Sequence, residues 1–136
     1  MQRTVVLHLL HTMNLFSWFP KPAPLRSESR VYDLKERLDW GEPALSIVDV
    51  RQRADFSASH ITGAMSIPAH QLVETAQRCF ELDRDLYLYG NTDEESKAAA
   101  EQLQAAGYTS VSVLRGGVSA WKAAGFPVEA IPAAVA

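Results

Sequence analysis

The sequence has few of the residues that build disulfide frameworks, metal clusters or membrane spans. Cys79 is the single cysteine among 136 residues, so neither an internal disulfide nor a multi-cysteine zinc or iron–sulfur site can form. The longest apolar stretch, Val5–Phe19, is interrupted by polar residues and falls short of the roughly 20 apolar residues that span a bilayer. Val5–Leu10 is also shorter than the apolar core of a secretory signal. We therefore expect a cytoplasmic protein that needs no cofactor.

The charge of the chain is slightly negative and unevenly distributed. There are 13 basic and 16 acidic residues, for a net charge of −3. Residues 1–30 contain four basic residues and one acidic residue, so the remaining chain is clearly acidic. An acidic domain repels phosphate backbones, which argues against nucleic acid as a partner. With 47% hydrophobic and 21% charged residues, the composition is that of a folded globular domain.

Residues 1–29 are predicted to be an N-terminal extension with a proline-rich linker at Pro20–Pro24. Apolar residues at helical spacing come before the linker, and three interpretations of residues 5–19 stay open. They could form an extra helix packed on the domain, or a disordered leader, above all if translation starts at Met13 rather than Met1. They could also lie on a membrane surface, which we disfavour because the polar face has few cations.

After the linker, segments with helix and strand patterns alternate. Apolar, β-branched runs predict strands at Leu45–Val50, Ala64–Ile67, Asp85–Tyr89 and Ser110–Leu114. Helices are predicted at Val31–Leu38, Gln71–Phe80, Glu94–Ala106 and Val118–Ala124. In the third helix, Ala98, Ala99, Leu103 and Ala106 are expected on the buried face. This alternation indicates an α/β fold with a mainly parallel sheet and helices on both faces.

Two motifs resemble the signatures of rhodanese-like domains. The first runs from Asp49-Val-Arg51 through His60-Ile-Thr-Gly63-Ala to Pro68, and the second contains Gly116-Gly117 followed by Trp121. The resemblance covers residues 30–130 and leaves 131–136 as a C-terminal tail. It implies a small α/β domain with a five-stranded, mostly parallel sheet.

Most of the motif residues also have structural explanations. Asp49 and Arg51 are expected to form an ion pair, and His60 to orient a loop through backbone hydrogen bonds. The glycine pair permits tight backbone geometry, and Trp121 is expected in the core. These residues therefore argue for the fold rather than for an activity.

The loop before the long helix departs from the family pattern. In active relatives, as the resemblance implies, this loop begins with a cysteine whose thiolate accepts sulfane sulfur from a donor such as thiosulfate, and it reads approximately C-x-x-G-x-R-S. In this sequence the aligned residues are Gly90, Asn91, Thr92, Asp93, Glu94, Glu95 and Ser96. Glycine stands at the cysteine position and Glu95 at the cationic position, so sulfur transfer through this loop is not expected.

The acidic residues have a local role of their own. Thr92 and Glu95 match a capping box, and Asp93 and Glu94 in the first turn complement the helix dipole. Their carboxylates should exclude thiosulfate and phosphate alike. Carboxylates also suit Mg²⁺ or Ca²⁺, but consecutive helical residues point to different sides, so no metal site is expected.

The leading hypothesis is a catalytically inactive rhodanese-like domain that acts as a protein-binding or regulatory module. Its partner would present a basic surface to the acidic loop between Gly90 and Glu95. The alternative is a sulfurtransferase that uses Cys79 or a cysteine of another chain, although we expect Cys79 to be buried or half-buried near a helix end. A third hypothesis is an accessory domain tethered to a membrane through residues 5–19.

Overall fold

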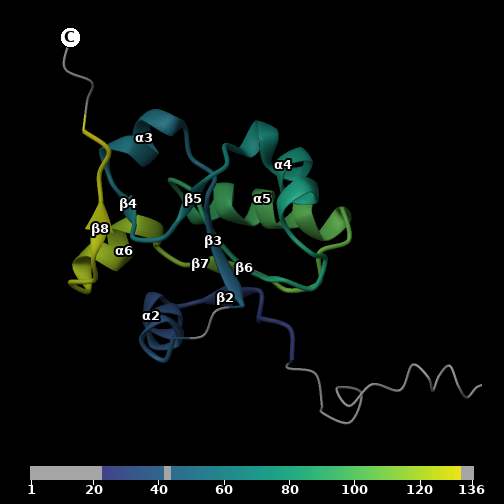
Figure 1. Cartoon of the computed structure of the whole chain (residues 1–136), viewed down its shortest axis with the longest axis horizontal. Helices are drawn as coiled ribbons and strands as arrows, with labels where there is room; N and C mark the ends of the chain where they lie inside the picture. Colours follow the sequence, from purple (N-terminus) through teal and green to yellow (C-terminus); the bar gives the residue numbers. More distant parts are fainter. Residues whose placement is uncertain (1–22, 42–43, 133–136) are drawn as a thin grey trace, which may run out of the picture.

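The computed structural model describes residues 23–41 and 44–132, and its centre is a five-stranded sheet (Figure 1). The strands lie in the order β2 (Glu28–Ser29), β7 (Val111–Leu114), β6 (Asp85–Tyr89), β3 (Leu45–Asp49) and β5 (Met65–Ser66). Every neighbouring pair is parallel. The predicted α/β fold with a five-stranded, mostly parallel sheet is therefore confirmed.

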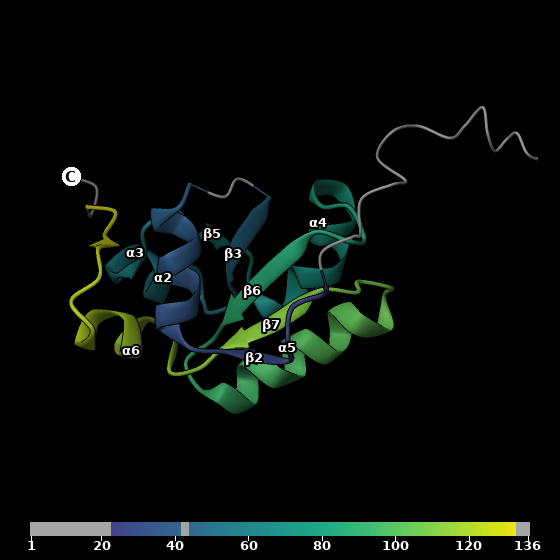
Figure 2. The same cartoon turned by 90° about the horizontal axis from the view of Figure 1, so that it is seen from below.

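Helices cover both faces of this sheet (Figure 2). The helices are α2 (Val31–Asp39) and α6 (Gly117–Ala123) on one face, and α4 (Leu72–Cys79) and α5 (Asp93–Ala105) on the other. Successive strand residues point to opposite faces. In β6, for example, Tyr87 and Tyr89 join the core under α2 and α6, whereas Leu86 and Leu88 join the core under α4 and α5. Trp121 is only 1% exposed and lies in the first of these two cores.

One predicted helix face is wrong in detail. Ala98 is exposed, and the buried residues of α5 are Ser96, Ala99, Ala100 and Leu103. These positions are three or four residues apart and so share one face of the helix. Ala98 points away from that face, and an alanine at an exposed helical position looks the same in the sequence as a buried one.

Several short elements were not predicted. They are β2, α3 (Arg53–Ala58), the 3₁₀ turn η2 (Ala69–Gln71) and an antiparallel pair formed by β4 (His60–Ile61) and β8 (Val128–Glu129). β2 pairs with β7 ahead of residue 30, where the domain was expected to begin. The N–H of Leu25 also donates to Ser110 Oγ at 2.8 Å. The folded domain therefore includes Leu25, Glu28 and Ser29, which the sequence placed in the N-terminal extension.

The expectations for residues 5–19 and for the choice between Met1 and Met13 lie outside the described residues, as do 133–136 of the tail. In residues 23–41 and 44–132, no helix has the length and apolar character needed to cross a membrane.

Candidate functional site

The candidate site is the loop Gly90–Ser96, which connects the carboxyl end of β6 to α5. Gly90 is buried, and its N–H donates to Ser96 Oγ at 2.8 Å. The same hydroxyl donates to the carbonyl oxygen of Thr92 at 3.0 Å. Ser96 is 1% exposed, so a buried hydroxyl fixes both ends of the loop.

Helix α5 is capped by Thr92, but the predicted capping box is only half formed. Thr92 Oγ1 accepts a hydrogen bond from the Glu95 N–H at 3.1 Å, as expected. In a complete capping box the Glu95 carboxylate would accept from the N–H of Thr92. Here Glu95 Oε1 accepts instead from the N–H of Asn91 at 3.2 Å. The Glu95 side chain thereby leans back over the start of the loop.

This placement of Glu95 fills the space beside Gly90. A Cβ atom built on Gly90 would lie 3.1 Å from Glu95 Cβ and 3.2 Å from Glu95 Oε1. It would also lie 3.4 Å from Val50 Cγ2. A side chain at position 90 therefore requires the Glu95 side chain to move.

A second loop packs against the first. Asp93 Oδ1 accepts from the N–H of Gly116 at 3.0 Å. Gly116 and Gly117 have φ angles of 76° and 53°, a conformation that favours glycine. A Cβ on Gly117 would lie 3.3 Å from the carbonyl oxygen of Gly90, so the glycine pair also allows the two loops to approach closely.

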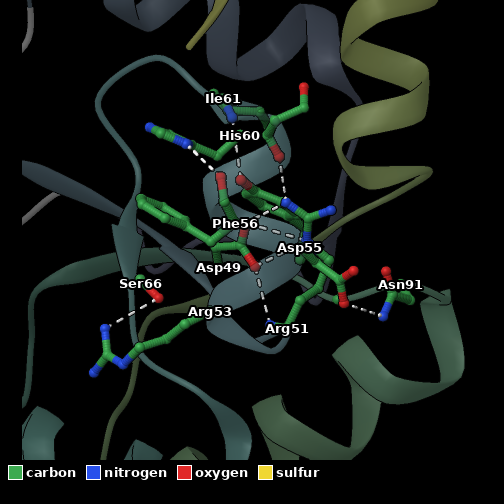
Figure 3. Close-up of polar contacts among 12 residues, drawn as sticks. Asp49, Arg51, Arg53, Asp55, Phe56, His60, Ile61, Ser66 and Asn91 are labelled. Atoms are coloured by element: carbon green, nitrogen blue, oxygen red, sulfur yellow. Dashed lines mark hydrogen bonds and ion pairs between the residues drawn. The ribbon is translucent and has the colours of Figure 1, made fainter. Parts of the chain in front are cut away.

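Asp49 and Arg51 form a buried ion pair beside this site (Figure 3). Arg51 Nη2 lies 2.7 Å from Asp49 Oδ2 and also donates to the Ser59 carbonyl oxygen at 2.6 Å. Burial alone would lower the pKa of Arg51, but hydrogen bonding to Asp49 and its negative charge outweigh that effect and raise the pKa. The expected ion pair forms, and its carboxylate is fully buried, since Asp49 has no exposed surface.

Tyr89 links this ion pair to β4. Its hydroxyl accepts from the N–H of Ile61 at 3.1 Å. Burial, with the nearby charge of Asp49, raises the pKa of Tyr89 far above its usual value. The phenol therefore stays protonated and acts as a structural group.

His60 serves the packing of α3 and β8. Its Nδ1 lies 2.8 Å from the carbonyl oxygen of Phe56, which can only accept, so Nδ1 donates. The imidazole stacks on the Phe56 ring with centroids 3.7 Å apart, and Nε2 lies 3.4 Å from Glu129 Oε1. Gly63, the next motif residue, has a φ of 89° in the turn after β4.

Helix α3 contributes one more carboxylate to the mouth of the loop. Asn91 Nδ2 donates to Asp55 Oδ2 at 3.4 Å (Figure 3). Asp55 thus joins Asp93, Glu94 and Glu95 around the loop, a contribution that sequence spacing did not reveal. Arg53 on the same helix is exposed and donates to Ser66 Oγ at 3.4 Å. Among the residues described, no group of three or more His, Cys, Asp or Glu side chains is placed to hold a metal ion.

Cys79 lies apart from the loop. The expectation that it is buried or half-buried is wrong, because it is exposed at the end of α4. It lines a 330 Å³ hollow with Phe80, Leu82 and Tyr108. Cys79 comes before the start of β6, and the loop comes after the end of β6. The thiol and the loop are therefore separated by the five residues of this strand, a length of about 16 Å.

Comparison with known proteins agrees with this fold. Residues 30–124 match the Rhodanese-like domain family. The chain belongs to this family.

Individual relatives are similar at moderate identity. A crystal structure of the Alr3790 protein from Anabaena is 48% identical, with a TM-score of 0.74 over 76% of this chain and 80% of that one. A protein of Allochromatium vinosum named "Sulfurtransferase" is 34% identical over 97 residues, which cover 71% of this chain and 89% of that protein. An uncharacterized protein of Synechocystis is 36% identical over 86 residues, 63% of this chain. The matched region spans about half of the Synechocystis protein, 48% of its length.

Proposed function

We propose that this chain is a rhodanese-like domain without sulfurtransferase activity that works as a protein-binding module through its acidic loop. The observation that carries the proposal is the occupation of the loop by Glu95. Its carboxylate fills the space that a side chain at position 90 would use. Glycine, which offers no nucleophile, stands where the resemblance places the sulfur-accepting thiolate.

The electrostatics of the loop support inactivity toward small anions. The N–H groups of Asn91 and Gly116 already donate to Glu95 and Asp93. An anionic sulfur donor would meet carboxylates where a catalytic site would offer hydrogen-bond donors and positive charge. The similarity to a protein named "Sulfurtransferase" therefore supports a shared fold, and we do not infer a shared reaction from it.

The same features favour a basic protein surface as the ligand. Glu94 and Glu95 are exposed on the first turn of α5, and Asp55 is half-buried beside them. Carboxylates on a rigid, capped helix end can meet lysine and arginine side chains without reorganisation of the loop. Such contacts set specificity and association rate more than affinity, which suits a regulatory module.

Binding of a short peptide rich in lysine and arginine tests this proposal. Fluorescence anisotropy should show saturable binding that weakens with salt, since the charges are exposed. Glu94→Gln should weaken binding several-fold, whereas Glu101→Gln, the same change at an exposed site further along α5, should leave it unchanged. Equal affinity for the wild type and both variants would overturn the assignment of the loop.

A sulfurtransferase that uses Cys79, or a cysteine of another chain, is the second candidate, and the exposure of Cys79 favours it. We expect no turnover in a thiosulfate-to-cyanide assay, because this thiol lies at the other end of β6 from the loop. Turnover that disappears in Cys79→Ser would replace our proposal with this second one.

A further inference from the structure

Two arginines leave the sheet side by side next to the acidic loop. β2 and β7 are parallel, with Ser29 opposite Leu114, so Arg30 and Arg115 follow directly from adjacent strands. The N–H of Arg115 donates to the carbonyl oxygen of Ser29 at 2.9 Å, which extends this register. Adjacent strands are about 4.8 Å apart. Figure 2 shows the two strands together, with α2 and α6 beginning beyond their ends.

The two arginines line one cleft. This hollow of 350 Å³ is lined by Arg30, Arg115, Tyr32, Val31, Ala120 and Asp93, among others. The side chains of Arg30 and Arg115 are 71% and 63% exposed. Tyr32 presents an exposed ring, and Val31 and Ala120 supply apolar lining. The cleft therefore combines hydrogen-bond donors of positive charge with an apolar wall.

The guanidinium groups keep donors available for a ligand. Arg30 contacts Asp33 through Nη2 at 3.1 Å and Nε at 3.4 Å. Arg115 Nε lies 3.6 Å from Glu28 Oε1, and the other Glu28 oxygen lies 3.6 Å from Lys97. A guanidinium has five N–H donors. Asp33 takes two of those of Arg30, and the 3.6 Å contact of the exposed Arg115 with Glu28 contributes little. A carboxylate from outside can therefore compete for both arginines.

The cleft and the acidic loop form one continuous surface with two signs of charge. Asp93 belongs to both, since it lines the cleft and holds the N–H of Gly116. The two loops also touch, because a Cβ on Gly117 would lie 3.3 Å from Gly90 O. The basic side lies beyond the ends of β2 and β7, and the acidic side follows the end of β6.

We propose that the Arg30–Arg115 cleft binds an acidic segment of a partner protein, with carboxylates on the arginines and an apolar side chain against Tyr32. The inference rests on the proposed protein-binding function and adds the partner's chemistry. The partner carries a basic group for the loop and, next to it, an acidic group for the cleft. Because the two charges differ, only one orientation of the partner satisfies both.

The test uses the full chain labelled with ¹⁵N and two synthetic peptides of equal length. The acidic probe is acetyl-Glu-Phe-Glu-Glu-amide, and the basic probe is acetyl-Lys-Phe-Lys-Arg-amide. The acidic probe should shift the amide resonances of Arg30, Tyr32 and Gly116. The basic probe should shift those of the loop from Asn91 to Glu95.

Variants then assign the acidic probe to the arginines. Arg115→Gln should weaken its binding about threefold, the effect expected from losing one contact between exposed charges. Arg30→Gln should act in the same direction. Arg78→Gln is the matched control, since Arg78 on α4 is also exposed and paired with an acid of its own helix, and it should leave binding unchanged.

The outcomes separate the two proposals. Shifts spread over the surface, or equal affinity for Arg115→Gln and the wild type, would overturn the cleft assignment. If only the basic probe binds, the cleft inference fails and the loop proposal survives. If only the acidic probe binds at the cleft, the loop proposal fails instead.

Discussion

Replacing Ser96 with alanine should loosen the loop and destabilise the whole domain. The Ser96 hydroxyl is the acceptor for the buried N–H of Gly90 and also donates to Thr92 O. Thr92 O keeps a partner in Ser96→Ala, because the backbone N–H of residue 96 donates to it at 3.1 Å. The Gly90 N–H loses its partner, which costs about 1–3 kcal/mol. The better helix propensity of alanine offsets about 0.5 kcal/mol of this cost, so we expect the free energy of unfolding to fall by about 0.5–2.5 kcal/mol.

Ser119→Ala is the matched control for this prediction. Ser119 is exposed in α6, so the same substitution there should be neutral or stabilising by up to about 0.5 kcal/mol. Urea unfolding of both variants measures the free energies, and amide hydrogen exchange at Gly90 reports the local opening. If Ser96→Ala is as stable as Ser119→Ala, the hydroxyl does not hold the loop as described.

Three further predictions concern two buried groups beside the site and the exposed Cys79. Asp49→Asn should lower the free energy of unfolding by about 3–5 kcal/mol in urea titrations, because it leaves the Arg51 charge buried and unpaired; a loss below about 1 kcal/mol would contradict this. The raised pKa of Tyr89 means that the folded state retains the phenolic proton longer than the unfolded chain. The stability that the protonated phenol contributes is complete below pH 10, the ordinary pKa of tyrosine, and is lost as the pH rises further. Above pH 10 the free energy of unfolding should decline less steeply in Tyr89→Phe than in the wild type. An equal slope would show that burial of Tyr89 does not cause the decline. Cys79 should react with a thiol reagent in the native protein at the rate of an exposed thiol, and protection until unfolding would show that its placement is wrong.

The main elements of the fold were predictable because they carry periodic signals. The strand at Asp85–Tyr89 has the same bounds in the structure as in the sequence prediction, since its apolar run ends at Gly90. Helix α5 differs from its predicted bounds by only one residue at each end. Both ends were predictable, since Thr92 caps the start and Gly107 follows the end. Burial within a helix that contains several alanines was less predictable, as Ala98 shows.

The missed elements are short and depend on tertiary contacts. The two-residue strands β2, β4 and β8 exist only because partners elsewhere in the chain pair with them. The six residues of α3 are too few for a helical period to stand out from a polar sequence.

At the site, the sequence predicted which residue types line the loop but not which atoms meet. Asp55 joins the loop through Asn91, 36 positions away in the chain, and no spacing rule links them. Asp93 bonds to Gly116 across two loops that only the sheet order brings together. The exposure of Cys79 depends on where α4 ends, which propensity fixes only within a few residues.

The central claim is that this domain neither accepts nor transfers sulfane sulfur, and intact mass spectrometry tests it most directly. The wild type and Cys79→Ser are each incubated with thiosulfate and measured without reduction. We predict that neither protein gains the mass of a sulfur atom. A persulfide on Cys79 of the wild type, and above all transfer of its outer sulfur to cyanide, would contradict the claim and make this domain a sulfurtransferase.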